Sequence, residues 1–566
     1  MSLKRFAFVS LQGQIITPFK VNHRYGYLLL MAPYNIKDGC ISCDSCRPQC
    51  PNGAIKSESE GDGYWIDPTL CDGCQDVEIP RCVEACSIGS LAPLQPKKGR
   101  YKSTLLPAAI PEIFLNGKTT PFASSMVMWE TCNVLAQRQA LPWQADPDGQ
   151  LRYHRTVHRG RGEIRFGLAT DPETDSAIPM TTDEARVAIA HFDIRAACIH
   201  LIFAAYATTV DCPWEDSFVL NDQHIEQYLG LEKRKDLTKL DKLTLIKDIV
   251  YQSCQLLVAL DWPRQGKVQS FSLDAHPVWQ LLDTHYYFEE EAQGGRHLIG
   301  LGFTVRAGIW AQHFLNKRDY RHQTAFYQYG TLPQSLIGQV MSNWQQHEGA
   351  MRLLLWLLFK LRLGGEHRMT VRTLLRLAYG EERLLEATTV RGAHKRLLKT
   401  FESDLETICT YGLKPLFDPD TYPPDIQPLW ARVGDIPEEA DAALEFWTED
   451  ANCALSLTDV APRDKWKRLL NARLMGFELS EEWQQTERRT PAKRRRQSPT
   501  QVKAPSGQLC SREIKAARQR EKITQRALAE RLGKSQSWIR DVEKGRFNIN
   551  IDDQAMLRQA LNIQSD

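Results

Sequence analysis

Residues 40–51 read CISCDSCRPQCP, and residues 71–86 read CDGCQDVEIPRCVEAC. The first stretch has the spacing C-x2-C-x2-C-x3-C-P, and the second has C-x2-C-x7-C-x3-C. Three thiolates on one tight loop can each reach a different iron of a cubane cluster, and such soft ligands are typical of iron–sulfur sites. Pairs of CxxC also bind zinc, but the first spacing is not one that zinc sites use. The two stretches therefore predict iron–sulfur chemistry, with a pair of zinc knuckles as the alternative.

The first spacing resembles that of bacterial ferredoxins with two [4Fe–4S] clusters, in which the fourth cysteine of a run ligates the other cluster. The resemblance implies that one cluster is bound by Cys40, Cys43, Cys46 and Cys86. It implies that the second cluster is bound by Cys71, Cys74, Cys82 and Cys50. The second run departs from the usual form, because its middle gap is one residue shorter and Ser87 stands where proline is usual. Four ligands remain for each cluster, so we expect both to assemble.

The length and composition of the chain set further limits. A chain of 566 residues is too long for one core, so three or more domains are expected, and the net charge of +2 excludes a general polycation. The apolar run LLLWLLF at 353–359 is far shorter than the about 20 residues that cross a bilayer, and it predicts a buried core helix. Residues 1–9 hold no apolar stretch with a cleavage site. We therefore expect a cytoplasmic protein with reduced thiols and no membrane partner.

Seven more cysteines lie outside the two runs, and none of them belongs to a CxxC pair. They are Cys132, Cys198, Cys212, Cys254, Cys409, Cys453 and Cys510. A redox-sensing thiol is one interpretation. The other, which we favour, is a small buried hydrophobic residue, because free cysteine usually has that role.

Residues 481–510 are predicted to form a basic, disordered linker. The stretch 488–508 reads RRTPAKRRRQSPTQVKAPSGQ and has no large apolar residue apart from Val502, so it cannot bury a core. The three arginines at 494–496 can bind phosphate backbones by non-specific electrostatics.

Residues 511–566 have the pattern of an all-α helix-turn-helix domain. Thr524 is expected to cap the second helix, Gly533 to supply the turn and Ser535 to cap the third helix. The segment resembles the Cro/repressor class of DNA-binding domains. A helical oligomerisation bundle is the alternative.

The exposed face of the third predicted helix supplies the candidate DNA contacts. In this class the N-terminal part of that helix enters the major groove. Gln can bond adenine in a bidentate way, and Arg can do so with guanine. The resemblance gives Gln525 a phosphate contact, whereas Trp538 belongs either to the core or to a contact with thymine methyls. The predicted DNA-binding residues are Gln525, Ser535, Gln536, Ser537, Arg540, Asp541 and Lys544.

The middle region, residues 101–480, is predicted to be mainly helical. The order helix, helix, hairpin occurs twice and suggests two winged-helix-like units at about 190–290 and 340–430, the first with a hairpin around Gln265 and Gly266. Candidate phosphate contacts in these units are Lys233, Arg234, Lys235, Arg391 and Lys395. A helical scaffold with solvated charges is the alternative.

No catalytic motif stands out in the chain. The sequence Gly300-Leu301-Gly302 lacks the third glycine and the context of a dinucleotide-binding turn, and neither a P-loop nor a GxSxG motif is present. The histidines form no paired metal motif. We therefore expect a protein that is not an enzyme.

The predicted architecture is a multidomain α+β protein. Its parts are a two-cluster ferredoxin module at 1–100, the middle region at 101–480, the linker at 481–510 and the helix-turn-helix domain at 511–566. This combination resembles the cyanobacterial nitrogen-fixation regulators of the CnfR/PatB family. The resemblance covers the order of the parts along the whole chain, but only the two terminal modules carry specific motifs.

The resemblance implies an activator of nitrogen-fixation genes under low oxygen, with two [4Fe–4S] clusters as the oxygen or redox sensor. Double-stranded promoter DNA is the implied partner, and a second copy of the chain, RNA polymerase and a ferredoxin are further candidates. Two other classes stay open. One is an electron-transfer subunit of a redox enzyme, and the other is a DNA-binding protein of the replication-initiator kind.

Overall fold

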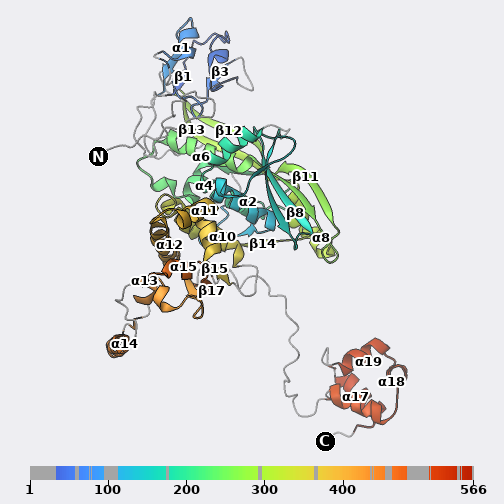
Figure 1. The fold of residues 1–566 in the computed structure, drawn as a ribbon. Helices are drawn as coiled ribbons and strands as arrows, with labels where there is room; N and C mark the ends of the chain where they lie inside the picture. The colour runs from blue at the N-terminus through green and yellow to red at the C-terminus, as the bar shows by residue number, and fades with distance from the viewer. Residues whose placement is uncertain are drawn as a thin grey trace. The chain divides into compact units, whose positions relative to one another are not determined.

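The computed structural model describes residues 33–94, 112–361, 368–483 and 509–563, apart from gaps at 38, 58–62, 75–76, 78, 174–177, 291–295, 434–435, 438, 453–461, 481–482, 510, 545–548 and 550. The chain forms two compact units, Met1–Thr490 and Pro491–Asp566 (Figure 1). Of the predicted linker, only Trp483 and Leu509 are described. The three arginines at 494–496 lie outside the described residues.

The cysteine-rich module folds as two small antiparallel sheets. Its elements are β1 (Tyr34–Ile36), η1 (Arg47–Gln49), β2 (Ile55–Ser57), β3 (Tyr64–Ile66), α1 (Arg81–Ala85) and β4 (Leu91–Pro93). Strand β1 pairs with β4, and β2 pairs with β3. Because the β1–β4 pair joins the beginning of the module to its end, the two cysteine runs are held close to each other. The small core contains Ala54, Ile55, Ile66 and Leu91, together with Cys46 and Cys82.

The middle region contains a five-stranded antiparallel sheet of order β11–β10–β8–β7–β6. The strands are β6 (Gln144–Ala145), β7 (Leu151–Val157), β8 (Gly162–Leu168), β10 (Leu256–Trp262) and β11 (Phe271–Pro277). Strand β10 is central and almost wholly buried, so its sequence LLVALDW does not alternate between apolar and polar residues. The chain enters this sheet directly from a long helix.

A three-stranded sheet of order β12–β13–β9 packs with three helices. The elements are α4 (Ile194–Tyr206), β9 (Phe218–Asn221), α5 (Asp222–Tyr228), η3 (Leu231–Lys233), α6 (Lys239–Cys254), β12 (Trp279–Glu290) and β13 (Arg296–Ala307). Helix α4 is buried along its whole length, as its apolar sequence requires. His200 of α4 accepts a hydrogen bond from the Trp279 indole (2.9 Å), and its other ring nitrogen lies 3.0 Å from the Met128 carbonyl oxygen. Burial lowers the pKa of His200 to about 4, so this link is neutral at physiological pH.

A second three-stranded sheet, of order β15–β17–β16, also packs with three helices. The elements are α10 (Glu348–Lys360), β15 (Met369–Thr370), α11 (Val371–Thr389), α12 (Ala393–Thr410), β16 (Leu413–Phe417) and β17 (Arg473–Leu479). All residues of the run at 353–359 except Trp356 are buried in α10, which confirms the predicted core helix.

Asp404 joins the three helices of this second group. Its buried carboxylate accepts a hydrogen bond from the Tyr379 hydroxyl (2.5 Å) and lies 3.1 Å from Nδ1 of His347. Helix α10 approaches so closely that a Cβ at Gly349 would lie 2.3 Å from the Asp404 carboxylate. The glycine therefore permits the contact that aligns the three helices.

The other elements cover and connect these sheets. They are β5 (Thr119–Ala123), which pairs with β14 (Tyr329–Pro333), and α2 (Met126–Gln137), η2 (Arg138–Ala140), α3 (Thr182–His191), α7 (Trp310–Phe314), α8 (Lys317–His322), α9 (Gln334–Asn343), η4 (Pro424–Ile426), α13 (Leu429–Val433), α14 (Ala440–Asn452) and α15 (Lys465–Leu469). Within the described part of the chain, no single helix has the length and apolar composition to cross a membrane, although α3 and α4, which are bent by 90° to each other, pass that test as a pair.

The middle region is a mixture of helix and strand and not mainly helical as predicted. The stretch KLDKLTLIKDIVYQSCQLLVAL at 239–260 has the pattern of one long amphipathic helix, but α6 ends at Cys254 and β10 begins at Leu256. A short apolar run in a doubly buried strand cannot be told from a helix by periodicity. The hairpin around Gly266 does form, but it belongs to the five-stranded sheet, whereas the hairpin that pairs with β9 is β12–β13.

The cysteines outside the two runs are mostly inert. Cys132, Cys198 and Cys254 are fully buried, and burial raises the pKa of each thiol well above its usual range. Cys212 and Cys409 are partly exposed, and burial raises their pKa values as well. Cys453 and Cys510 lie outside the described residues.

The C-terminal unit is a four-helix domain with its own core. The helices are α17 (Ser511–Arg520), α18 (Gln525–Arg531), α19 (Gln536–Glu543) and α20 (Ile551–Ala560). Thr524 and Ser535 cap α18 and α19 by accepting backbone hydrogen bonds of 3.1 Å each, and Gly533 turns the chain at φ 61°. The core residues are Leu509, Ile514, Ala517, Leu528, Ala529, Ile539, Val542, Ile549, Leu557 and Leu561.

Because this core is self-contained, we expect residues 491–566 to fold alone and to unfold cooperatively. Replacing the fully buried Ile539 with Ala should lower the free energy of unfolding by about 2–5 kcal/mol. The exposed Gln536→Ala variant on the same helix should change it by less than about 0.5 kcal/mol. Urea unfolding followed by circular dichroism measures both. An isolated segment without a helical spectrum would contradict this division of the chain.

Candidate metal centres and nucleic-acid interface

Four cysteines from the two ends of the module line one small cavity. They are Cys40, Cys43, Cys46 and Cys86. Apolar residues, among them Ile36 and Leu91, form the rest of the wall. Burial raises the pKa of the Cys46 thiol, and charge repulsion from the other three cysteines adds to the increase. The structure thus brings Cys86 to the first cysteine run, 40 residues away in sequence.

The other four cysteines line a second cavity. They are Cys50, Cys71, Cys74 and Cys82. Burial, with charge repulsion from its neighbours, raises the pKa of Cys82 to about 12. Backbone N–H groups point at two of the sulfurs: Tyr34 donates to Cys71 (3.4 Å) and Ala54 donates to Cys50 (3.3 Å).

Each cavity has the donor set that an iron–sulfur cluster requires. A cubane cluster binds its four thiolates through four different irons, so its ligands surround a cavity and do not converge on one atom. In the described ranges, no three His, Cys, Asp or Glu side chains converge as ligands of a single metal ion. The N–H groups that point at sulfur stabilise thiolates and are one of the contacts by which proteins tune a cluster's potential.

The loops that carry the cysteines are tightly turned. Ser42, Asp44 and Cys74 have positive φ angles of 52–58°, a conformation that non-glycine residues seldom adopt. Local carboxylates stabilise these turns. Asp44 pairs with Arg47 (2.6 Å), and Asp72 accepts the backbone N–H of Cys74 (2.9 Å).

A buried aspartate connects the second cavity to the middle region. The backbone oxygen of Asp67 accepts the N–H of Cys71 (3.0 Å), and its Oδ1 accepts the N–H of Thr69 (2.9 Å). Its Oδ2 accepts hydrogen bonds from the Lys247 ammonium of α6 (2.7 Å) and from the Tyr286 hydroxyl of β12 (3.1 Å). Asp67 is 0% exposed, and the side chain of Lys247 is 7% exposed. Asp67 therefore holds the ligand loop and the middle region together.

Aromatic rings extend this contact. Trp65 of β3 packs against Tyr286 and Phe288 of β12, with ring centroids 4.7 and 5.4 Å apart. The Lys247 ammonium lies 5.1 Å from the Tyr286 ring centroid. In Figure 1 the blue cysteine-rich module lies next to β12, β13 and α6. No spacing pattern signals this contact, because Asp67 and Lys247 are 180 residues apart in the chain.

The predicted DNA-binding residues other than Gln525 lie on α19 and its two caps. Ser535, Gln536, Ser537, Arg540 and Lys544 are exposed, and Asp541 is partly buried. Arg540 is 51% exposed and lies 3.8 Å from Asp541, a loose surface pair of little energy. Trp538 packs against the domain core, with the Lys534 ammonium 5.3 Å from its ring centroid.

A polar contact that the sequence did not reveal fixes the two helices of the motif. The Gln525 amide donates to Glu543 (2.7 Å), and Arg518 donates to both oxygens of the same carboxylate. Burial alone would raise the pKa of Glu543, but these hydrogen bonds outweigh it and hold the pKa below its usual range. Gln525, the predicted phosphate contact, thus uses its amide within the domain.

The candidate phosphate contacts of the middle region lie on the surface. Lys233, Arg234 and Lys235 are exposed before α6, and Arg234 pairs with Asp236 (2.5 Å). The others, Arg391 and Lys395, are exposed at the beginning of α12.

Comparison with known proteins finds relatives of the modules at both ends of the chain. The family model described as Helix-turn-helix, HTH_3, matches residues 514–566. The chain therefore carries a helix-turn-helix DNA-binding domain, as predicted.

The N-terminal part is similar to small curated proteins. A "Ferredoxin-like protein in nif region" of Trichormus variabilis is 44% identical over 55 residues, which are 9% of this chain and 47% of that protein. "Ferredoxin-1" of Chlorobaculum tepidum is 40% identical over 57 residues, 10% of this chain and 87% of that protein. Over this segment the chain belongs to the ferredoxin family. That similarity indicates iron–sulfur clusters in the module.

The ferredoxin similarity covers little of the whole chain, which spans about half the length of the first curated relatives it matches. A "Ferredoxin-like protein in vnf region" of Azotobacter vinelandii is 39% identical over 49 residues, 9% of this chain and 72% of that protein. A crystal structure of domains 2 and 3 of RctB matches 49% of this chain and 85% of that chain, with 12% identity and a TM-score of 0.26. A TM-score that low supports no structural argument.

The two cavities predict which cysteines of the ferredoxin module act together. Cys50→Ser and Cys82→Ser should each remove the same cluster, about four irons per chain, although Cys50 is next to the first run in sequence. The double variant should lose no more iron than either single variant, whereas Cys50→Ser with Cys46→Ser should lose about eight irons. Iron and sulfide analysis with spin resonance after anaerobic purification measures this. Cys409→Ser is the control, and stoichiometric zinc without iron would contradict the cluster assignment.

The exposed face of α19 predicts base-specific contacts. Gln536→Ala or Arg540→Ala should lower the affinity for the specific site by about 1–3 kcal/mol, because each would remove a predicted bidentate base contact. Affinity for random DNA should change less. Fluorescence anisotropy on both duplexes measures the difference, and Arg526→Ala on the exposed face of α18 is a control for lost charge. Equal losses on both duplexes would mean that these residues do not read bases.

Proposed function

We propose that this protein is an oxygen- or redox-responsive transcriptional activator that binds promoter DNA through its helix-turn-helix domain and holds two [4Fe–4S] clusters as its sensor. The observation that carries the proposal is that one chain combines two four-cysteine cavities with a DNA-binding domain. A cytoplasmic location and a non-enzymatic role follow from this proposal.

Nitrogen-fixation genes are the proposed targets. The relatives of the module include ferredoxin-like proteins of nif and vnf regions. The order of parts resembles the CnfR/PatB regulators, which supports the same assignment. Activation only at low oxygen suits such genes, because nitrogenase is destroyed by oxygen.

The cysteines would hold the clusters as the cavities group them: Cys40, Cys43, Cys46 and Cys86 in one, and Cys50, Cys71, Cys74 and Cys82 in the other. Such clusters exchange single electrons and are degraded by oxygen, so their presence reports low oxygen. The residues of this chain provide the cysteine sulfurs, of which Cys46, Cys74 and Cys82 are buried, together with N–H donors to sulfur and apolar walls that limit the entry of water.

The Asp67 contact supports a route from the sensor to the rest of the protein. Loss of a cluster would release the loop that carries Cys71 and Cys74, and Asp67 helps to shape that loop. Freed from the loop, Asp67 would no longer be placed to meet Lys247 and Tyr286. A two-state docking of the ferredoxin module is therefore the proposed switch, since a sensor must bias an equilibrium between two arrangements.

The middle region is proposed to contain two winged-helix-like units. Each three-stranded sheet supports this assignment, because its first strand (β9 or β15) precedes two helices and its other two strands (β12 and β13, or β16 and β17) follow them. These units also keep a second function open, that of a DNA-binding protein of the replication-initiator kind. Candidate partners beyond DNA are a second copy of this chain, RNA polymerase and a separate ferredoxin. The third class, an electron-transfer subunit, would need another cofactor site.

A DNA-binding assay in argon and in air separates these functions. Protein purified anaerobically, with its clusters confirmed by spin resonance, should bind promoter fragments in a gel shift and lose at least about tenfold in affinity after air exposure. A replication initiator would bind an origin fragment regardless of oxygen. An electron-transfer subunit would bind no fragment specifically.

Lys247→Met tests the docking contact, because it leaves the buried Asp67 charge without its partner while all eight cysteines remain. We expect full iron content, DNA binding that no longer depends on air, and faster hydrogen exchange at residues 64–71 and 284–288. The free energy of unfolding should fall by about 3–5 kcal/mol, because the variant leaves one charge of a buried ion pair without its partner. Lys267→Met, in the exposed β10–β11 turn, is the matched control. Normal air sensitivity in Lys247→Met would exclude this contact as the coupling.

A further inference from the structure

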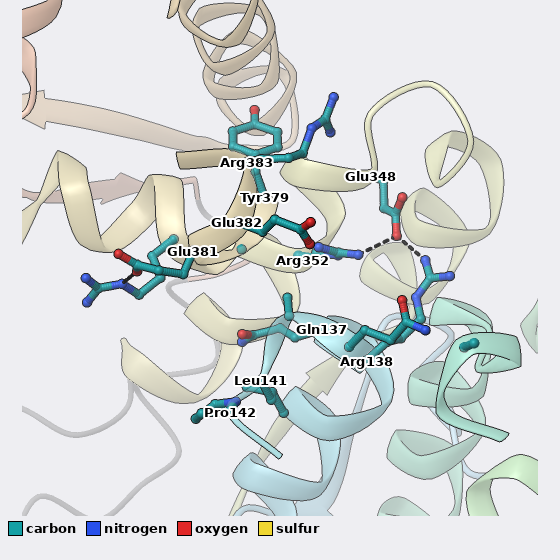
Figure 2. Close-up of a pocket in the computed structure, with 15 residues that line it drawn as sticks. Gln137, Arg138, Leu141, Pro142, Glu348, Arg352, Tyr379, Glu381, Glu382 and Arg383 are labelled. Atoms are coloured by element: carbon teal, nitrogen blue, oxygen red, sulfur yellow. Dashed lines mark hydrogen bonds and ion pairs between the residues drawn. The ribbon is translucent and has the colours of Figure 1, made fainter. Parts of the chain in front are cut away.

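A cavity of about 710 Å³ lies where the end of α2 meets helices α10 and α11 (Figure 2). Small-molecule sites in proteins typically have volumes of about 300–1,000 Å³. Its wall is rich in charge: it contains four arginines and three glutamates, a net charge of +1. They are Arg138, Arg352, Arg376, Arg383, Glu348, Glu381 and Glu382.

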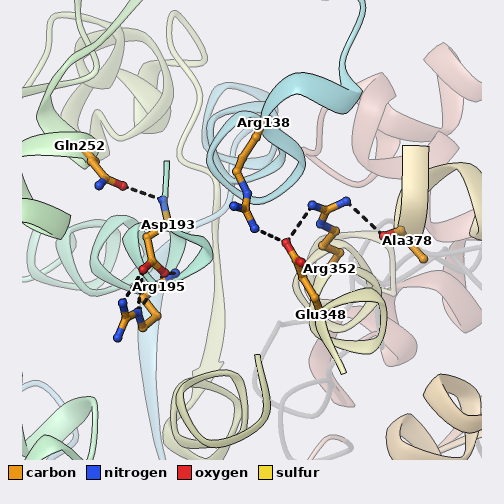
Figure 3. A network of polar contacts seen from close by, with 7 residues as sticks. All are labelled: Arg138, Asp193, Arg195, Gln252, Glu348, Arg352 and Ala378. Atoms are coloured by element: carbon orange, nitrogen blue, oxygen red, sulfur yellow. Dashed lines mark hydrogen bonds and ion pairs between the residues drawn. The ribbon is translucent and has the colours of Figure 1, made fainter. Parts of the chain in front are cut away.

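The positive charge at one end of the cavity is only partly neutralised. Glu348 accepts hydrogen bonds from both Arg138 and Arg352, the second at 2.8 Å, so two guanidinium groups share one carboxylate (Figure 3). Arg383 contacts the Tyr379 ring at 5.8 Å and pairs with no carboxylate among the described residues. Burial lowers the pKa of Arg352, and repulsion from Arg138 and Arg383 lowers it further, against the attraction of Glu348.

Several polar groups of the wall lack partners. Gln137 is 7% exposed and lines the cavity, where its side chain forms no hydrogen bond with any described residue (Figure 2). The Nε–H groups of Arg138 and Arg352 are also buried without an acceptor. Buried polar groups in folded proteins are almost always hydrogen-bonded. Two such exceptions, beside a cavity that the Gln137 amide also lines, therefore indicate a site that is completed by a polar molecule.

The backbone has unusual conformations on two sides of the cavity, at Arg138 and at Gly380. Arg138 has φ 54° and ψ −123°, a conformation that costs a non-glycine residue about 1–3 kcal/mol, and the Trp143 indole donates to its carbonyl oxygen (3.0 Å). On the opposite wall, Gly380 interrupts α11 at φ 83°, where a Cβ would lie 2.8 Å from the Ala140 Cβ. Strained residues of this kind are common at binding sites.

We propose that this cavity binds a small organic oxyanion, a carboxylate or a phosphate ester of metabolite size, through Arg352, Arg383 and Gln137. Guanidinium groups bind both oxyanions in a bidentate way, and an amide adds a neutral hydrogen bond. Helix α11 leads directly into α12; Arg391 lies just before α12, and Lys395 lies in its first turn. The bound anion would thus set the arrangement of α10 and α11 beneath those candidate phosphate contacts. This site is independent of the clusters and goes beyond the proposed function.

The test uses the full chain and three probes: citrate, glucose 6-phosphate and the neutral sugar glucose, each in buffers of equal ionic strength. Calorimetric titration up to about 10 mM covers the millimolar range of weak metabolite sites. Citrate binding without glucose 6-phosphate binding identifies a carboxylate site, and the reverse identifies a phosphate site. Binding of both identifies a general oxyanion site. Glucose should not bind. If neither anion binds, the proposal is overturned.

Two variants test whether the anion binds in this cavity. Arg383→Gln and Gln137→Leu should each weaken binding of the anion by about tenfold, the effect of one hydrogen bond to a charged group. Arg383 lies at the surface and has no carboxylate partner, so its variant should fold. Arg396→Gln, on the exposed face of α12, is the control with the same loss of charge. Binding that is equally strong in Arg383→Gln, Gln137→Leu and the control would overturn the proposal.

Discussion

Asp67 is bonded at the same time to the loop that presents Cys71 and to two residues of the middle region, Lys247 and Tyr286. A carboxylate that is removed from water is stable only when opposite charge and hydrogen bonds surround it, so this contact tolerates little displacement. The same residue that shapes the ligand loop thus anchors the ferredoxin module. Because both roles belong to one residue, Asp67 supports the proposed link between the state of the second cavity and the docking of the module.

The cysteine pattern and the C-terminal helices could be predicted because their signals are local. The spacing around Cys46 and Cys82, and the caps Thr524 and Ser535, each depend on residues within one loop or one helix turn. The bond from Gln525 to Glu543 and the contact of Asp67 with Lys247 could not be predicted in the same way, since they join distant segments. No periodicity or spacing rule marks such a pair of charges.

In the middle region, sequence patterns do not predict the element boundaries or the cavity. A strand that is buried on both faces, such as β10, has the same kind of apolar run as a core helix. The sequence pattern therefore does not mark the boundary between α6 and β10 after Cys254. The arginine-lined cavity has no sequence motif either, because its wall comes from the end of α2 at Gln137 and from helices α10 and α11, which begin only at Glu348 and Val371. What makes it distinctive is physical. Arg138 and Arg352 share a single carboxylate, and their Nε–H groups are buried without an acceptor among the described residues.

If the ferredoxin module makes transcriptional activation depend on oxygen, promoter activity must differ between air and argon only when the module is present. The measurement compares a reporter driven by a target promoter in cells that carry the intact chain with one in cells that carry a chain lacking residues 1–100. The account predicts that the intact chain activates strongly under argon and weakly in air, and that the shortened chain gives the same activity in both. Equal activation by the intact chain in air and under argon would contradict the account.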